Sequence, residues 1–287
     1  SRATVMSEKN ADQIAFWNSS HGIAWARNTD IIDVMFSDIT EAIASAAAIN
    51  VGDHVLDLGC GSGGTMLAVA NRVGSAGSVT AIDVSNSMID RAEERCRAKN
   101  LKNVTCIRGD AASYPFSDAS FNKLISRLGA MFFDDPAVAF TRLRQTLKPS
   151  GRVALGVWRE PRENHWAMEP VAAAKKYLNM PPRPGPEEPG PFSFAKPDRV
   201  RNILAGAGWR DIELSPLNFV IPHGRSITEA LIFVLRMGPL ARPLSEASGE
   251  NRVKAIDAIK QVLKNNTGDD GIVRMAGACW IVTARAD

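Results

Sequence analysis

The stretch HVLDLGCGSGGTMLAVANRVG, residues 54–74, carries the strongest fold signal in the chain. Residues 54–59 are a short apolar run typical of a buried parallel strand, and residues 64–74 have the pattern of a helix that Gly74 ends. A glycine-rich turn, residues 59–64, joins the two. A strand, a glycine turn and a helix in succession predict one unit of a parallel sheet covered by helices.

The same alternation continues on the C-terminal side of this unit. Strands are predicted at 79–83, 104–109, 121–126 and 152–158, with a helix after Ser85 and another that carries Phe140, Leu143 and Leu147. Six prolines within residues 181–191 predict a loop. Further helices are expected from Asp198, over 227–237 and around 253–263, with strands near 212–221 and 273–284. The pattern indicates the α/β fold class.

Composition restricts the function classes. The chain has 287 residues, of which 45% are hydrophobic, so it can form a core, and its net charge of +3 gives no reason to expect nucleic-acid or membrane partners. No window approaches the roughly 20 apolar residues that span a bilayer, and the polar residues 1–10 predict no export signal. The four cysteines show no CxxC spacing, which predicts reduced thiols in a cytoplasmic protein and no zinc site.

Acidic residues follow three successive strands, at Asp57, Asp83 and Asp110. The turn also satisfies G-x-G-x-x-G, so an NAD-dependent dehydrogenase is an alternative. Asp57 argues against it, because a carboxylate at the strand tip repels a pyrophosphate and attracts an ammonium group. S-adenosylmethionine offers an amino group for Asp57, a ribose diol for Asp83 and an adenine amine for Asp110. The competing interpretation is that Asp83 and Asp110 are ordinary loop caps.

Three segments give the chain a family resemblance. VLDLGCGSGG, AIDVSNSMI and GDAASYPFSDASFNKLIS resemble the class I S-adenosylmethionine-dependent methyltransferases, nearest to the ubiquinone and menaquinone biosynthesis type. The resemblance covers about residues 50–158, and more weakly LKPSGR and AGAGWRDIEL. It implies a Rossmann-like seven-stranded sheet whose last, antiparallel strand, residues 273–284, lies beside 152–158. Asn122 departs from the pattern, since an acid is usual there.

The resemblance also implies which residues hold the cofactor. It assigns the methionine part of S-adenosylmethionine to Asp57, Gly59, Cys60 and Gly61, and the ribose to Asp83. It places Val84 and Met88 on the two faces of the adenine, and Asp110 and Ala111 at its edge. Arg127 borders both cofactor and substrate; it can orient an anionic substrate or pair with a carboxylate. An arginine at this position also disfavours a magnesium site, so no metal is expected.

A sulfonium is already an activated electrophile, so methyl transfer depends mainly on proximity and exclusion of water. The candidate bases are His165, which follows the fifth strand, and His21, although a lone histidine is more often a surface residue. Trp17, Trp25 and Trp166 are candidate substrate contacts, and the competing interpretation is that these rings only pack the helices.

The expected organisation surrounds the core with a lid and a cap. Residues 1–45 form an N-terminal helical lid, 46–158 the cofactor core, 159–197 and 222–271 cap insertions, 198–221 the continued core and 272–287 the final strand. The predicted function is methyl transfer to oxygen or carbon of a small, largely apolar or aromatic metabolite. A dehydrogenase and a protein that binds the cofactor without methyl transfer are the alternatives, a nucleic-acid methyltransferase is disfavoured, and the oligomeric state is left open.

Overall fold

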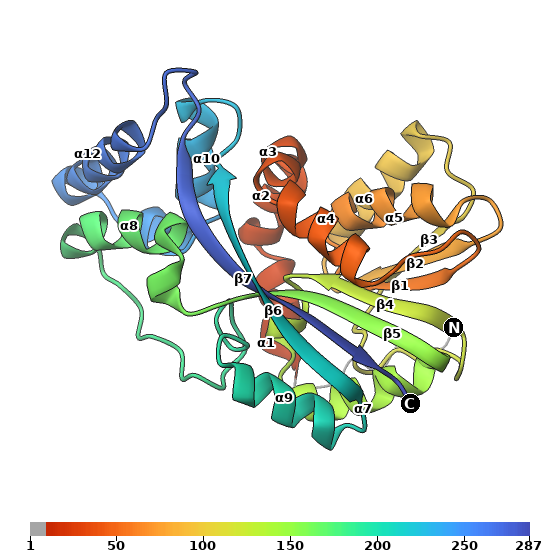
Figure 1. The fold of residues 1–287 in the computed structure, drawn as a ribbon. Coiled ribbons are helices and arrows are strands. Elements are labelled where there is room, and N and C mark those ends of the chain that lie inside the picture. The colour runs from red at the N-terminus through yellow and green to blue at the C-terminus, as the bar shows by residue number, and fades with distance from the viewer. Residues whose placement is uncertain (1–9) are drawn as a thin grey trace.

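The computed structural model describes residues 10–287, and its centre is one seven-stranded sheet of order β3-β2-β1-β4-β5-β7-β6 (Figure 1). Strands β1 to β5 are parallel, whereas β7 pairs antiparallel with both β5 and β6. The predicted fold is confirmed, including the last strand beside β5. The strands are β1 (His54–Leu58), β2 (Ser78–Asp83), β3 (Val104–Arg108), β4 (Phe121–Arg127), β5 (Leu147–Trp158), β6 (Arg210–Pro222) and β7 (Arg274–Arg285).

Helices cover both faces of the sheet. In Figure 1, α4 (Ser37–Ala46), α5 (Gly64–Val73) and α6 (Asn86–Ala98) lie on one face, and α7 (Pro136–Thr146) and α9 (Pro197–Gly206) on the other. The Ser85 side chain accepts a hydrogen bond from the Met88 backbone N–H and caps α6, as predicted. Apolar side chains on the inner faces of these helices and on both sides of β1 form the core.

The two insertions expected at 159–197 and 222–271 meet in one cap. It contains α8 (His165–Ala174), α10 (Ile227–Arg236), α11 (Ala241–Glu246) and α12 (Gly249–Asn265), with short 3-10 helices η3 (Pro161–Glu163) and η4 (Lys175–Tyr177). Helix α12 packs along α8 because Ile259 and Leu263 are fully buried, and Asn266 donates a hydrogen bond to Glu169 at 3.1 Å. The proline-rich residues 181–191 form a loop, as predicted.

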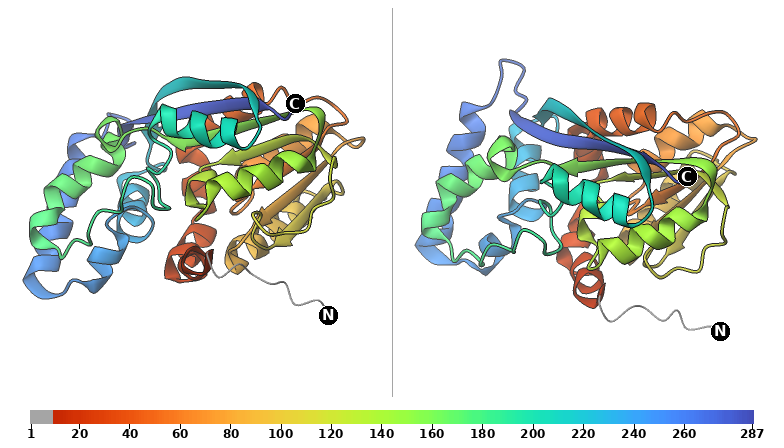
Figure 2. Two further views of the ribbon diagram at one scale, coloured as in Figure 1. Left: turned by 90° about the horizontal axis from the view of Figure 1, so that it is seen from below. Right: turned by 60° about the horizontal axis from the view of Figure 1, so that its bottom comes forward.

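The N-terminal lid consists of three helices, α1 (Ala11–Trp17), α2 (Ser20–Arg27) and α3 (Thr29–Met35). Figure 2 shows α1 between the cap and α6. Residues 37–45, expected in the lid, belong to α4, which packs on the sheet: a Cβ added to Gly156 of β5 would lie 2.8 Å from Ile39. The expectations for residues 1–9 lie outside the described residues.

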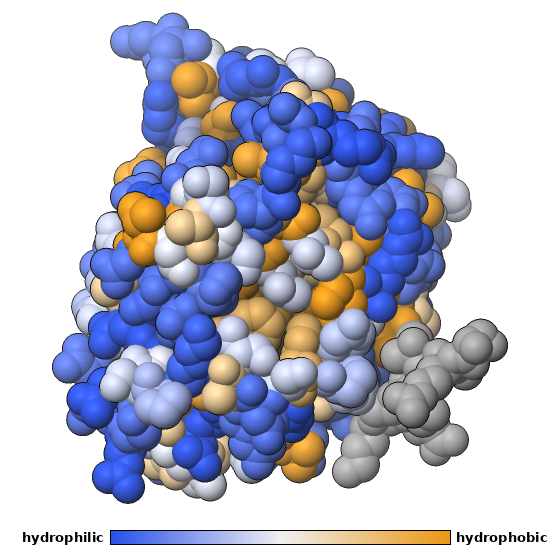
Figure 3. Space-filling view, turned by 90° about the vertical axis from the view of Figure 1, so that its right-hand side faces the viewer, coloured by the Kyte–Doolittle hydropathy of each residue, from blue (hydrophilic) through white to orange (hydrophobic). Residues whose placement is uncertain are grey.

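Figure 3 shows one face, on which apolar residues gather in a central patch surrounded by hydrophilic ones. Within residues 10–287, no helix combines the length and the apolar character needed to cross a membrane.

Candidate functional site

The glycine turn after β1 lies where the strand order reverses, because β2 continues the sheet on one side of β1 and β4 on the other. Open α/β sheets bind ligands at such a point, outside the carboxyl ends of the strands. Gly59 and Gly61 have φ angles of +62° and +55°, which favour glycine. A Cβ on Gly59 would lie 3.1 Å from the Gly129 Cα. The turns after β1 and β4 therefore approach backbone to backbone.

Asp57, the fourth residue of β1, has a carboxylate that is buried and unpaired. Its side chain is 1% exposed, and neither oxygen has a hydrogen-bond partner among residues 10–287. Burial raises the pKa of Asp57 to about 7, with Arg127 acting in the opposite direction. Buried polar groups are almost always hydrogen-bonded, so such an acid indicates a missing cationic or donor partner.

Asp83, at the end of β2, is held by the turn itself. Its carboxylate accepts hydrogen bonds from the backbone N–H groups of Gly61 at 2.8 Å and Ser85 at 2.9 Å. Burial raises the pKa of Asp83, and these N–H groups partly oppose that effect. Asp83 therefore fixes the glycine turn in position and keeps further oxygen lone pairs for a ligand.

Asp110 follows β3 and is 3% exposed. One carboxylate oxygen accepts the Ala112 backbone N–H at 3.0 Å, and the other accepts the side-chain amide of Asn10 at 2.9 Å. Asn10 directly precedes α1, the first helix of the lid. The lid therefore reaches the third of the acids that the sequence selects.

The other expected cofactor residues lie around the same turn. Cys60 and Met88 are buried, and the Met88 sulfur would lie 4.0 Å from a Cβ on Gly61. Burial raises the pKa of the Cys60 thiol well above its ordinary value. The backbone carbonyl of Val84 accepts a hydrogen bond from Asn18, and Ala111 is buried beside Asp110.

Arg127, the last residue of β4, lies over the start of α5. Its Nη1 donates to the Thr40 hydroxyl at 2.9 Å, and a Cβ on Gly64 would lie 2.9 Å from the same nitrogen. Burial lowers the pKa of Arg127, with the nearby charges of Asp33 and Asp57 opposing the change. Arg127 is thus part of a charge cluster that also contains Asp57.

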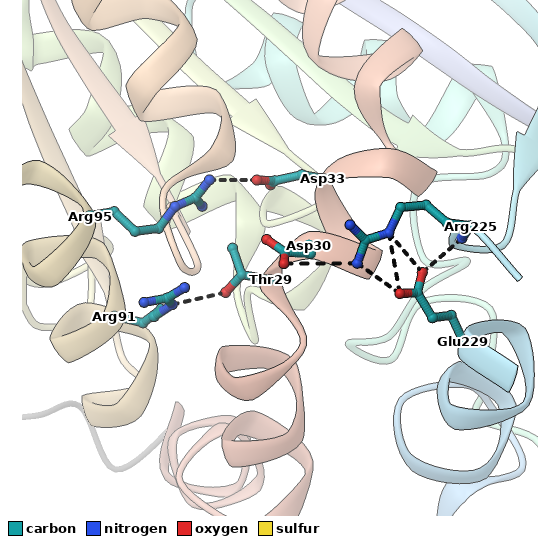
Figure 4. Close-up of polar contacts among 7 residues, drawn as sticks. All are labelled: Thr29, Asp30, Asp33, Arg91, Arg95, Arg225 and Glu229. Carbon is teal, nitrogen blue, oxygen red and sulfur yellow. Dashed lines mark hydrogen bonds and ion pairs between the residues drawn. The ribbon is translucent and has the colours of Figure 1, made fainter. Parts of the chain in front are cut away.

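The lid is fixed to both the core and the cap (Figure 4). On the core side, Asp33 of α3 pairs with Arg95 of α6 at 2.5 Å. On the cap side, Asp30 lies 4.0 Å from Arg225, which itself pairs with Glu229 of α10 at 2.8 Å. Helix α3 therefore stands between two arginines from different parts of the chain.

Aromatic rings of the lid contact the core and the cap. Trp17 meets Phe132 of the 3-10 helix η2 (Ala130–Phe132), with ring centroids 5.3 Å apart. Trp25 lies 5.8 Å from Trp17 and 6.4 Å from Phe233 of α10. We call Trp17, His21, Trp25 and Phe132 the aromatic cluster. Phe132 of this cluster lies in the segment after β4, which approaches the glycine turn at Gly129.

The two histidine candidates have different surroundings. His21 belongs to the aromatic cluster, its Nε2 accepts the Trp25 indole N–H at 3.0 Å, and burial lowers its pKa to about 4. His165 was expected to face the transfer site. Instead it lies on the exposed side of α8, with its Nδ1 3.5 Å from the Glu169 carboxylate. The structure thus brings only His21 together with the lid tryptophans.

Trp166 lies outside the aromatic cluster but contacts Phe233 of α10, the ring that Trp25 also contacts. Its ring is 7% exposed, its centroid lies 4.8 Å from that of Trp158, and its indole N–H donates to Asn164 at 3.0 Å. These contacts favour the packing interpretation for Trp166. Among residues 10–287, no group of three or more His, Cys, Asp or Glu side chains is arranged to hold a metal ion.

Several residues of the site carry no signal that sequence reasoning used. Asn10 and Asn18 attach the lid to the loops after β3 and β2, and Asp33 joins the charge cluster. Thr65, in the first turn of α5, has a buried hydroxyl without a partner among the described residues. The one sequence signal for Asn10 and Thr65 is that each is a polar residue at the start of a helix.

Comparison with known proteins agrees with this geometry. A sequence profile described as a methyltransferase domain matches residues 55–151. Demethylmenaquinone methyltransferase of Lactobacillus johnsonii is 33% identical over 108 residues, which are 37% of this chain and 44% of that protein. Nocamycin O-methyltransferase of Saccharothrix syringae is 30% identical over 170 residues, which are 56% and 60% of the two chains. The chain therefore spans about half the length of these two relatives.

A solved structure extends the likeness beyond the matched segment. Phosphoethanolamine N-methyltransferase 2 of Haemonchus contortus, in complex with S-adenosyl-L-methionine, is similar with a TM-score of 0.58 at 18% identity, covering 98% of this chain and 60% of that one. At this identity the likeness shows the fold alone. Residues 55–151 thus match a methyltransferase domain, and the comparisons together support a class I S-adenosylmethionine-dependent methyltransferase.

Proposed function

We propose that this protein transfers the methyl group of S-adenosylmethionine to an oxygen or carbon atom of a small, largely apolar or aromatic metabolite. The observation that carries the proposal is the buried, unpaired carboxylate of Asp57 in the glycine turn. The positively charged α-amino group of S-adenosylmethionine would pair with this carboxylate, whereas the negatively charged pyrophosphate of NAD would be repelled by it. The charge of Asp57 therefore supports the amino acid end of S-adenosylmethionine as the ligand of the turn.

The residues around the turn fit the rest of the cofactor. Asp83 retains lone pairs for the ribose hydroxyls, and Asp110 for the adenine amine. When bound, S-adenosylmethionine supplies an electrophilic methyl group. The chain's own part is to orient that group, to exclude water with the lid, and to hold the acceptor in line.

The aromatic cluster supports the assignment of the acceptor class. Trp17, Trp25 and Phe132 present rings beside the end of β4, and flat apolar surfaces of this kind line pockets for small aromatic molecules. The names of two relatives, a demethylmenaquinone and a nocamycin methyltransferase, agree with quinone-like or polyketide-like acceptors. For Arg127 we keep the proposed role of orienting an anionic group on the acceptor.

Calorimetric titration with S-adenosylhomocysteine and with NAD tests the cofactor assignment. We expect S-adenosylhomocysteine to bind and NAD to give no heat of binding. Binding of NAD without binding of S-adenosylhomocysteine would identify the dehydrogenase alternative. Incubation with methyl-labelled S-adenosylmethionine and a panel of hydroxylated aromatic compounds then tests turnover, because a protein that only binds the cofactor leaves every acceptor unlabelled.

His21 is the side chain proposed to take the acceptor proton. Tryptophan only donates, so the single lone pair of the neutral His21 ring lies on Nε2 and accepts the Trp25 N–H. The lowered pKa keeps the ring neutral above about pH 4, and His21 takes the acceptor proton only when the hydrogen bond to Trp25 opens. We expect His21→Ala to lower kcat about 100-fold while the Kd of the cofactor stays unchanged. His165→Ala is the matched control and should change neither quantity. An unchanged kcat in His21→Ala would mean that transfer proceeds by proximity alone.

A further inference from the structure

Asn10 has an unusual pair of environments at its two amide atoms. The side chain is 8% exposed, and its Nδ2 donates to Asp110 Oδ2 at 2.9 Å. Its Oδ1 is buried and has no hydrogen-bond partner among residues 10–287. An ionised carboxylate only accepts hydrogen bonds, so Asp110 fixes which amide atom faces it. The oxygen of Asn10 therefore remains a free acceptor beside the acid.

Asp110 itself has capacity left on the shared oxygen. Its Oδ1 accepts the Ala112 N–H and its Oδ2 accepts Asn10, but each carboxylate oxygen can accept two hydrogen bonds. One free lone pair on Asp110 Oδ2 thus lies next to the unpaired Oδ1 of Asn10. Two neighbouring acceptors without donors match a ligand group that carries two N–H bonds.

We propose that Asn10 and Asp110 together read the 6-amino group of the cofactor's adenine, each accepting one of its two N–H bonds. The inference rests on the proposed function, since it assumes that S-adenosylmethionine occupies the turn. It adds a lid residue to the cofactor site and makes that site selective for a 6-aminopurine. A 6-oxopurine would place a carbonyl oxygen against both acceptors and would be rejected.

The lid is held in a fixed relation to the nucleoside side of the site. At the C-terminal end of α1, the Asn18 amide donates to the Val84 carbonyl at 2.9 Å and accepts the Asn86 backbone N–H at 2.9 Å. These contacts attach α1 to the loop that follows Asp83. Asn10 thus belongs to a helix fixed at both ends, and its amide is preorganised for recognition.

A second buried acceptor lies one helical turn further along α1. The Gln13 Oε1 is buried and also lacks a partner among the described residues. Asn10 directly precedes α1 and Gln13 lies in its first turn, so both amide oxygens belong to the N-terminal end of this helix. Two unsatisfied acceptors on one short helix are unusual for packing alone and fit a ligand-facing surface.

The test compares the Kd of S-adenosylhomocysteine with that of S-inosylhomocysteine, its 6-oxo analogue, for the full-length chain. We expect the wild-type protein to prefer S-adenosylhomocysteine by about 100-fold, and Asn10→Ala to reduce that preference to about 10-fold. Asn10→Leu, which keeps the side-chain bulk, should behave in the same way. Asp12→Ala, on the exposed side of α1, is the matched control and should keep the wild-type ratio.

Asn18→Ala separates lid attachment from base recognition. This variant should weaken both ligands by the same factor, because its contacts are to backbone and not to the base. If Asn10→Ala and Asn10→Leu keep the wild-type ratio, or lose both ligands equally, Asn10 does not read the base and the inference is overturned. If the wild-type protein binds neither ligand, the proposed function fails and the inference fails with it.

Discussion

Asp57→Ala is expected to weaken binding of S-adenosylhomocysteine by roughly 100- to 1000-fold, because it removes a buried carboxylate whose proposed partner is the ligand's ammonium group. No described residue hydrogen-bonds to this carboxylate, so its removal breaks no internal hydrogen bond. Calorimetry on the purified variant measures the loss, and circular dichroism establishes that the fold is retained. A variant that binds like the wild-type protein would contradict the assignment of Asp57.

The same carboxylate should make binding depend on pH. Burial raises the pKa of Asp57 to about 7 in the cofactor-free protein, and only the ionised form pairs with the ammonium group. We therefore expect the affinity for S-adenosylhomocysteine to rise about tenfold per pH unit from pH 5 until it levels near pH 7. In Asp57→Asn this rise should disappear. A wild-type affinity that is constant between pH 5 and 7 would exclude an ionising Asp57 from the binding step.

Although Asp57→Asn should weaken cofactor binding, it should raise the free energy of unfolding of the cofactor-free protein at pH 8. The folded-state pKa of about 7 lies above the value of about 4 for an unfolded aspartate, so the unfolded chain releases this proton first as the pH rises. The wild-type protein consequently loses free energy of unfolding between pH 4 and 7, on the order of 3–4 kcal/mol from this group. Asparagine does not ionise and avoids that loss.

Urea unfolding at pH 5 and pH 8, without cofactor, measures this difference. The free energy of unfolding of Asp57→Asn minus that of the wild-type protein should be more positive at pH 8 than at pH 5. Asp257→Asn, at an exposed position of α12, is the control and should show no such change with pH. If the difference for Asp57→Asn is the same at both pH values, the pKa of Asp57 is not raised in the folded protein. The proposal that its carboxylate awaits a cationic partner then loses its support.

Local sequence patterns predicted the sheet because each of its strands had its own signal. The glycine turn, the Ser85 cap and the alternation to residue 158 all correspond to elements of the structure. Leu147 was expected to end a helix, but α7 ends at Thr146 and Leu147 begins β5. The assignment of residues 37–45 to the lid also failed, since the apolar face of α4 looks the same in sequence whether it packs on a sheet or on another helix.

The positions of the three acids followed from local sequence patterns, whereas the surroundings of the candidate bases and tryptophans did not. Asp57, Asp83 and Asp110 each lie at or near the carboxyl end of a strand, and parallel strands bring these ends to one edge of the sheet. The environments of His165 and Trp166 depend instead on how the cap folds. Asn10 gave no signal, because its contact to Asp110 joins residues 100 positions apart. Contacts of that range arise from tertiary packing and leave no local pattern.

The connection between β6 and β7 contains three helices, α10, α11 and α12, although its two ends are neighbours. Pro222, at the end of β6, pairs directly with Arg274, at the start of β7. Antiparallel strands that meet in this way need only a two-residue link. The pairing of β6 with β7 therefore does not depend on the helical excursion, so the number and length of its helices can vary without any change in the register of the two strands.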